Sequence, residues 1–176
     1  MKQTQSPNSE QILPDVLAGG LDVVFCGSAA GSASAQAGAY YAGPGNRFWP
    51  ILHESGMTPR QLDPRDFRDV VQYRIGLTDL SKFQSGADSV LDAGGDDVGA
   101  LAEKITAYAP RALAFNGKRA GSVFLREIFA SKIDDYGLQP QVLGATALFV
   151  LPSTSGAARR WWDAAPWRAL SEYLGR

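Results

Sequence analysis

The chain has 176 residues, but only one cysteine and one histidine. A single cysteine, Cys26, excludes a disulfide within the chain and any zinc or iron–sulfur site built from cysteines. No apolar run reaches the length that crosses a bilayer, and the polar N-terminus lacks the apolar stretch of a signal peptide. We therefore expect a cytoplasmic protein with no membrane partner.

An excess of either charge is also missing, since 17 Lys and Arg face 18 Asp and Glu and the net charge is −1. Nothing in the overall charge attracts nucleic acid or an anionic membrane, although a local basic stripe can still bind nucleic acid. Four arginines near the C-terminus are such a stripe in the sequence: Arg159, Arg160, Arg168 and Arg176.

Short apolar runs bounded by turn residues predict three buried parallel strands, over 21–27, 111–117 and 147–153, and residues 139–144 are a candidate fourth. Helical patterns predict helices over 10–18, 46–56, 63–76, 96–110, 118–132 and 159–176, the last broken near Pro166. This alternation predicts a single three-layer α/β/α domain over 10–176 with a mainly parallel sheet, preceded by a disordered lead over 1–9.

A loop rich in Gly, Ala and Ser, "GSAAGSASAQAG" over 27–38, follows the first predicted strand. It has neither the G-x-G-x-x-G nor the G-x-x-x-x-G-K-[ST] spacing of nucleotide-binding loops. A serine hydrolase is also disfavoured, because His53 is the only histidine and there is no G-x-S-x-G motif. Cys26 lies in an apolar run and is expected to be a core residue.

Four segments in order resemble the mismatch-specific uracil-DNA glycosylases and their thymine-DNA glycosylase relatives. They are "VVFCGSAAGSASAQAGAYYAGPGNRFWPILHESGMTPRQL" from Val23, "YRIGLTDL" from Tyr73, "YAPRALAFNGKRA" from Tyr108 and "VLPSTSGAARR" from Val150. The resemblance implies a uracil-DNA glycosylase-like fold and a monofunctional enzyme without cofactor or metal. Such an enzyme flips uracil or a related base out of DNA and hydrolyses its N-glycosidic bond, leaving an abasic site.

The implied partner is double-stranded DNA, with single-stranded DNA as an alternative, and the implied state is a monomer associated with the nucleoid when bound. The resemblance places the base pocket at Gly27, Ser28, Ala29, Ala30, Gly31, Ser34 and Tyr41. Within it, Tyr41 is expected to stack on the flipped base, whereas Tyr40 is a packing residue. Asn46 as a helix N-cap and Arg47 as a salt-bridging side chain are expected to support the loop, with Phe48 and Trp49 in the core.

One position departs from the family pattern, because Ala29 stands where the family has an asparagine that orients the attacking water. A methyl group cannot do this, so another side chain is needed if the chain is an enzyme. A carboxylate can activate water and stabilise a sugar cation. Asp79 is the first candidate, with Asp88 and Asp92 as alternatives, and a structural turn or helix cap is the competing role for Asp79.

The segment "PSTSGAARR" corresponds to the family's second, DNA-inserting loop. The DNA-binding residues expected from it and from the Gly-Lys pair after the second predicted strand are Ser153, Thr154, Ser155, Gly156, Ala157, Arg159, Arg160 and Lys118. Ala157 is too small to fill the gap left by a flipped base, so Arg159 or Arg160 is expected to fill it. A non-catalytic protein that binds uracil or abasic sites is the alternative function, and an unrelated small-molecule hydrolase is a third.

Overall fold

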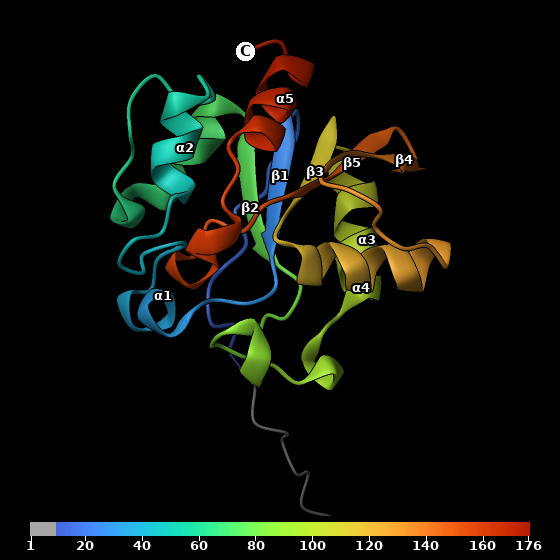
Figure 1. Cartoon of the computed structure of the whole chain (residues 1–176), viewed down its shortest axis with the longest axis horizontal. Coiled ribbons are helices and arrows are strands. Elements are labelled where there is room, and N and C mark those ends of the chain that lie inside the picture. The colour runs from blue at the N-terminus through green and yellow to red at the C-terminus, as the bar shows by residue number, and fades with distance from the viewer. Residues whose placement is uncertain (1–9) are drawn as a thin grey trace, which may run out of the picture.

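The computed structural model describes residues 10–176, and the predicted disordered lead over 1–9 lies outside them. The strands are β1 (Val23–Gly27), β2 (Ile75–Asp79), β3 (Ala112–Asn116), β4 (Gly137–Leu143) and β5 (Thr146–Leu151). They form one sheet in the order β2-β1-β3-β5-β4, in which only the edge strand β4 is antiparallel (Figure 1). The predicted α/β fold with a mainly parallel sheet is confirmed.

Helices cover both faces of the sheet and divide the core into two layers (Figure 1). Successive side chains of a strand point to opposite faces. Phe25 accordingly packs against Phe48 and Trp167 on one face, while Cys26 is fully buried on the other. The first layer includes α2 (Phe48–Glu54) and α5 (Ala165–Tyr173), and the second includes α3 (Val98–Tyr108) and α4 (Lys118–Phe129).

The N-terminal segment differs from the prediction, because residues 10–18 form no helix. Val16 instead makes an isolated antiparallel bridge with Leu77 of β2. Pro14 lies in the middle of the segment, where it removes a backbone donor and favours an extended conformation in the residue before it. The segment thereby crosses the edge of the sheet and brings Asp15 to Thr78, whose hydroxyl donates to the Asp15 carboxylate at 2.7 Å.

The predicted helix over 63–76 runs into a strand that sequence reasoning missed. A 3₁₀ helix, η1 (Pro64–Tyr73), begins after Asp63, whose side chain accepts from the Arg65 N–H as an N-cap. It ends at Arg74, which has a left-handed φ of 60°, and β2 begins at the next residue. Residues 75 and 76 are therefore strand, and β2 places Asp79 at its carboxyl end.

The C-terminal pattern over 159–176 forms two helices. A 3₁₀ helix, η4 (Gly156–Trp161), ends before α5, and Pro166 lies in the first turn of α5, where a missing N–H is tolerated. The candidate strand over 139–144 is confirmed as part of β4. Among residues 10–176, no helix is both long and apolar enough to cross a membrane.

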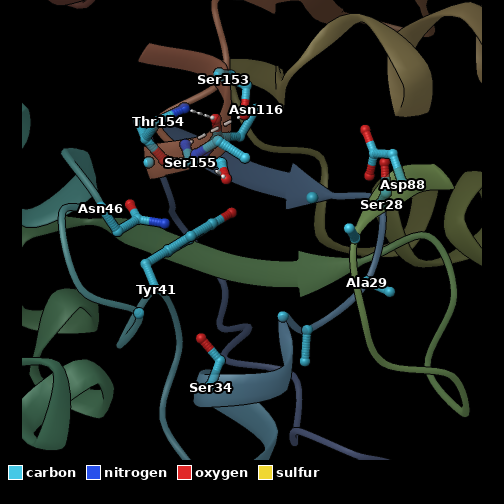
Figure 2. Close-up of a pocket in the computed structure, with 18 of the residues that line it drawn as sticks. Ser28, Ala29, Ser34, Tyr41, Asn46, Asp88, Asn116, Ser153, Thr154 and Ser155 are labelled. Carbon is cyan, nitrogen blue, oxygen red and sulfur yellow. Dashed lines mark hydrogen bonds between the residues drawn. The ribbon is translucent and has the colours of Figure 1, made fainter. Parts of the chain in front are cut away.

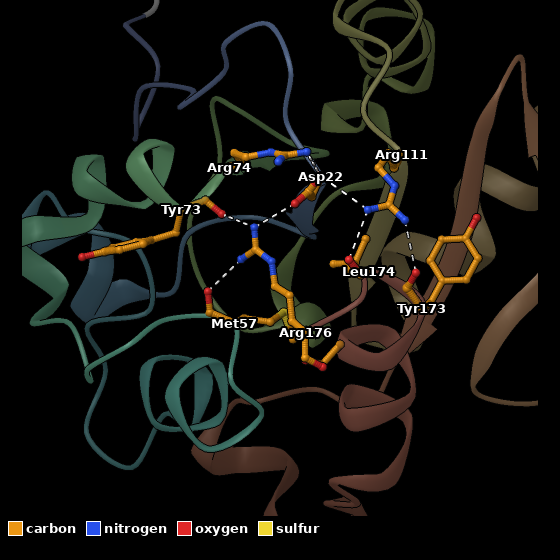
Figure 3. Close-up of polar contacts among 9 residues, drawn as sticks. Asp22, Met57, Tyr73, Arg74, Arg111, Tyr173, Leu174 and Arg176 are labelled. Carbon is orange, nitrogen blue, oxygen red and sulfur yellow. Dashed lines mark hydrogen bonds and ion pairs between the residues drawn. The ribbon is translucent and has the colours of Figure 1, made fainter.

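Arg176 does not belong to the basic stripe suggested by the sequence. Its guanidinium donates to buried Asp22 at 2.8 Å and to the Met57 carbonyl, also at 2.8 Å (Figure 3). Asp22 immediately precedes β1, so this contact lies at the amino edge of the sheet, whereas Arg159 and Arg160 follow β5 at the carboxyl edge. Arg74 and Arg111 also pair with Asp22, which ties three distant parts of the chain to one carboxylate.

Candidate active site

A cleft of about 730 Å³ opens at the carboxyl ends of the parallel strands. The strands contribute Gly27, Asp79 and Asn116 to its wall, and the segment after β5 contributes Ser153. Asn116 and Ser153 are labelled in Figure 2. In open α/β sheets, ligands bind at this edge, and the volume is that of a typical small-molecule site. The Gly/Ala/Ser loop over 27–38 (the first loop), the segment 152–160 (the second loop) and the candidate carboxylate Asp79 are far apart in the sequence. They nevertheless meet in one place.

Asp79 lies directly opposite Gly27 in the pairing of β2 with β1. A Cβ atom on Gly27 would lie 2.7 Å from the Asp79 carboxylate oxygen, so any other residue here would displace that carboxylate from its present position. Asp79 is 5 % exposed and lines the cleft. It is the N-cap of none of the helices over 10–176, so the competing role as a helix cap does not apply.

The surroundings of Asp79 make its carboxyl group a weaker acid than that of an exposed aspartate. Burial raises the pKa of its carboxyl from the usual 3.8 to about 6; the positive charge of Lys82 opposes the rise and the negative charge of Asp15 adds to it. A carboxyl group with such a pKa is ionised at neutral pH yet able to accept a proton. Perturbed titration in a cleft is typical of catalytic acids and bases.

Tyr41 extends across the cleft from the segment after α1 (Ser32–Ala37) (Figure 2). Its backbone has a left-handed φ of 52°, which is strained for a residue with a bulky side chain. Its ring packs on Phe48 with the centroids 4.0 Å apart, and its hydroxyl is buried without a hydrogen-bond partner among the described residues. The Ser34 hydroxyl accepts from the Ala42 N–H at 3.0 Å, which fixes the segment that carries Tyr41.

The rest of the first loop supplies small side chains to the cleft. Its members there are Ser28, Ala29, Ala30 and Gly31, in addition to Gly27. The carbonyl groups of Ser28 and Ala30 accept from the N–H groups of Ser81 and Gly86, so the loop is tied to the segment after β2. Ala29 is partly exposed in the cleft, and its methyl group provides no polar atom there.

The two residues expected to support the loop behave differently. The Asn46 side chain accepts from the Phe48 N–H at 3.0 Å, but the N-cap of α2 is Arg47, so Asn46 lies one residue before the predicted cap position. The expected salt bridge of Arg47 is wrong, because none of the ion pairs over 10–176 includes it and its guanidinium lies over the Trp162 ring at 5.4 Å. Its backbone N–H donates to the Thr154 carbonyl, which joins the first loop region to the second loop.

Asn116 and Thr154 anchor the second loop to the end of β3 (Figure 2). The Asn116 amide donates to the Thr154 hydroxyl at 2.9 Å and accepts from the Thr154 N–H at 3.0 Å. Thr154 is 1 % exposed, so its hydroxyl points inward. Ser153 and Ser155 lie at the cleft surface, and the Ser155 side chain caps η4 by accepting from Ala157.

Gly156 allows the second loop to approach the first loop region closely. A Cβ atom there would lie 3.1 Å from the Pro44 carbonyl oxygen. Ala157 and Arg159 also line the cleft. Together, these contacts make the second loop one wall of the cleft.

Not every predicted residue reaches the cleft. Asp88 lines it (Figure 2), but Asp92 caps the short helix η3 (Ala93–Gly95) by accepting from the Gly94 N–H. Arg160 is exposed on η4 without lining the cleft. Lys118 is exposed at the start of α4, with its ammonium group over the Tyr136 ring at 4.5 Å.

Sequence reasoning missed three residues. Asn116 ends a strand within the quoted "AFNG" block, which is the signal that could have placed it in the site. Trp161, 73 % exposed, stands at the cleft wall next to the two arginines. Lys82 is 6 % exposed and lies three residues after Asp79, but nothing in the sequence marks a buried lysine there.

A cleft of small residues with one buried carboxylate at the carboxyl edge of a parallel sheet defines the chain as an α/β protein with a site of small-molecule size. A sequence profile of the Uracil DNA glycosylase superfamily matches residues 14–173. The chain therefore belongs to the Uracil DNA glycosylase superfamily.

The fold is also similar to a solution NMR structure from Methanosarcina acetivorans, provisionally assigned as a uracil DNA glycosylase. The TM-score is 0.64 at 25% sequence identity, with 96% of this chain and 99% of that chain covered. Superfamily membership and this similarity support a role as a DNA glycosylase, with DNA as the partner.

Proposed function

We propose that the chain is a monofunctional DNA glycosylase that hydrolyses the N-glycosidic bond of uracil in DNA, with Asp79 as the catalytic carboxylate. The observation that carries this proposal is the position of Asp79, buried at the end of β2 against Gly27 and lining the cleft. Ala29 cannot orient water, whereas an ionised carboxylate beside the sugar can.

In the proposed reaction, the bond between uracil N1 and the sugar C1′ breaks, and its electron pair leaves with uracil. Asp79 stabilises the cationic sugar and takes a proton from water, whose oxygen bonds to C1′. The products are an abasic sugar, the uracil anion and protonated Asp79. The anion gains its proton from solvent after release, and Asp79 returns its proton to solvent, so the sum is hydrolysis.

The flipped base is proposed to lie between the first loop and Asn116, with Tyr41 beside it. The Asn116 amide still has one N–H and one lone pair beyond its bonds to Thr154, and an amide can pair with a uracil edge. The small residues from Ser28 to Gly31 let the backbone approach the base closely. Hydrogen-bond donors aimed at the uracil oxygens would stabilise their developing negative charge.

Trp161 is proposed to fill the gap that the extruded nucleotide leaves, a role expected of Arg159 or Arg160 from the sequence. Apolar wedges between base steps are a general means of holding a duplex open. Trp161 is the most exposed of the large apolar side chains over 10–176, at 73 %, and it lines the cleft. Arg159, which also lines it, remains free to contact phosphate or the opposite base.

The finer assignment, to the mismatch-specific and thymine-DNA glycosylase branch acting as a monomer on double-stranded DNA, is also part of the proposal. The presence of the N-R-F-W, F-N-G-K and P-S-x-S-G blocks in the family's order supports it. Because the motif asparagine is replaced by Ala29, the range of excised bases must be measured directly.

Labelled duplexes with G·U, A·U or G·T pairs, and single strands with uracil, test the proposal. After incubation with the protein, alkali cleaves the strand wherever a base has been removed. We expect scission of uracil-containing duplexes. Tight binding without scission in any substrate would contradict the enzyme and identify the alternative, a non-catalytic uracil-binding protein.

Two asparagine variants test the assignment of the carboxylate. Asp79→Asn is expected to remove scission at unchanged DNA affinity, while Asp88→Asn, in the same cleft, keeps most of it. The reverse pattern would move the catalytic role to Asp88. Trp161→Ala should weaken binding to uracil duplexes and reduce the fluorescence rise of a 2-aminopurine placed beside the uracil, whereas Trp161→Phe should retain both.

A further inference from the structure

A second cavity, of about 410 Å³, shares a single lining residue with the cleft among residues 10–176, and that residue is Asp79. The rest of its wall comes from Gln11, the segment 80–83, the turn 94–97 and residues 100–104 of α3. Apart from Asp79, none of the residues proposed to contact DNA lines it. The buried carboxylate therefore stands between the DNA-facing cleft and a separate space large enough for several water molecules.

The second cavity is polar on the side of Asp79. Lys82 and Lys104 line it, and each ammonium group contacts the Asp15 carboxylate, at 2.8 and 2.7 Å. Lys82 also donates to the Tyr40 hydroxyl at 3.1 Å. Beyond the effect of burial, the charges of Lys82 and Asp15 shift the pKa of Asp79 in opposite directions, and Lys104 forms an ion pair with Asp15. Burial and the Asp79 charge in turn raise the pKa values of Cys26, Tyr40 and Tyr41.

The wall of the second cavity carries further charges. Asp96 and Asp97 line it together with Lys82 and Lys104, and the Arg119 guanidinium donates to the Asp96 carboxylate at 3.0 Å. Burial and the Asp15 charge oppose the loss of the Asp79 proton, whereas the positive charge of Lys82 lowers the pKa of Asp79 and so favours that loss. Lys82 lines the second cavity and does not line the cleft, so the charge that favours deprotonation lies on the side away from the proposed base pocket.

We propose that the second cavity is the route through which Asp79 exchanges its proton with solvent while DNA covers the cleft, an inference that rests on the catalytic role given to Asp79 above. Hydrolysis transfers one proton from the attacking water to Asp79. A flipped nucleotide in the cleft blocks that side. The proton leaves through the second cavity to bulk water, and Asp79 becomes a carboxylate again without release of the DNA.

A removable plug tests this route. Ala100 lies on α3 and lines the second cavity, and Ala100→Cys can be converted to a mixed disulfide by benzyl methanethiosulfonate and restored by dithiothreitol. The native Cys26 will not interfere, because it is fully buried and burial raises the pKa of its thiol well above the usual value. Ala107→Cys, exposed about two turns further along α3, is the matched control.

The readout is a pH jump on preformed complexes with a uracil duplex. Complexes are assembled near pH 5, where Asp79 is mostly protonated, and moved to about pH 8 with excess unlabelled duplex as a trap. We expect a burst of abasic product from unmodified Ala100→Cys and from benzylated Ala107→Cys. Benzylated Ala100→Cys should give a burst at least about fivefold smaller, restored by dithiothreitol, yet react normally when the pH is raised before DNA is added.

An unchanged burst in the benzylated variant would overturn the route. The route would also be overturned if benzylation reduced the amount of abasic product equally whether the pH is raised before or after DNA is added. The benzyl group would then impair the excision reaction itself.

A second experiment needs bound DNA but no excision. The thiol of Ala100→Cys must react equally fast with and without DNA, while that of Ala33→Cys, in the cleft, is protected; protection of both overturns the route. Absence of scission by the unmodified protein in every condition would instead contradict the proposed function.

Discussion

Two buried aspartates at opposite edges of the same sheet have opposite surroundings. Asp22, before β1, is 3 % exposed and pairs with Arg74, Arg111 and Arg176 (Figure 3). Asp79, at the end of β2, is 5 % exposed and faces the cleft, and its pKa is raised to about 6 by burial. Similar burial thus accompanies a structural ion-pair cluster at one edge and a partly compensated carboxylate at the other.

The difference shows how position in a parallel sheet decides the use of a carboxylate. At the amino edge, arginines from three separate segments converge on Asp22 and satisfy its charge. At the carboxyl edge, the nearby ammonium group of Lys82 is committed to Asp15, so the Asp79 charge is only partly compensated. A charge that is satisfied stabilises the fold, whereas one that is not is available to a substrate.

Substitution of each aspartate by asparagine should separate catalysis from stability. We expect Asp79→Asn to lower the single-turnover excision rate by about 10²–10⁴, because a general base contributes that much. Asp22→Asn should keep the rate of the folded protein within about twofold, since Asp22 lies at the other edge of the sheet. The measurement is the rate of abasic-site formation with enzyme in excess, and equal losses in both variants would remove the distinction.

The same pair of variants should move the free energy of unfolding in opposite directions at pH 7. Asp22→Asn is expected to cost roughly 3 kcal/mol, at the low end for a buried ion pair because Arg74 and Arg111 are at least half exposed. Asp79→Asn should stabilise the protein, by up to about 3 kcal/mol, because the folded state holds its carboxyl at a pKa of about 6 rather than 3.8. Urea unfolding of both variants measures the two effects, and destabilisation by Asp79→Asn would contradict this account.

pH should reveal Asp79 in both stability and activity. The folded state binds more protons than the unfolded state between pH 3.8 and about 6, so stability relative to Asp79→Asn falls as pH rises through this window. The excision rate should instead rise through about pH 6, because the reaction needs the carboxylate. Single-turnover rates between pH 5 and 8 test this, and a flat profile would exclude titration of Asp79 as the controlling event.

A smaller effect distinguishes the arginines of the two edges. Arg159→Ala should reduce the salt dependence of DNA binding by about one counterion, because Arg159 lines the cleft beside the second loop. Arg176→Ala should leave that slope unchanged, since the guanidinium is bound to Asp22 and to two backbone carbonyls. Binding titrations at several salt concentrations measure the slope for both variants. An equal change in slope would show that Arg176 also contacts DNA, contrary to this prediction.

Local patterns in the sequence predicted most of the fold. The apolar runs of β1, β3 and β5 and the helical spacing of α2, α3 and α4 follow from short-range periodicity, which needs no knowledge of the tertiary structure. Strand β2 was not predicted, because its five residues follow a helical pattern without a clear turn signal. Their extended conformation depends on pairing with β1. The helix over 10–18 failed because contacts of Val16 and Asp15 with β2 outweigh a weak local preference.

The candidate site divides in the same way. The small residues after β1 and the second loop were recognisable as segments, and Asp79 was the first candidate from the missing amide at Ala29. The roles predicted for Arg47 and Arg176 were wrong because the partner of a charged side chain depends on the tertiary structure. Arg47 lies over the Trp162 ring, and Arg176 pairs with Asp22. Asp92 was indistinguishable from Asp88 in the sequence, and only the course of the loop separates a capping residue from a cleft residue.

The sequence by itself determined the class of fold, the superfamily blocks and the absence of an asparagine at position 29, because these depend on residue type and spacing along the chain. Only the tertiary structure decided that Asp79 lies against Gly27, that Lys82 is buried behind it and that a second cavity meets the same carboxylate. Burial and charge at a site are set by segments distant in sequence, and here the pairing of β2 with β1 brings them together.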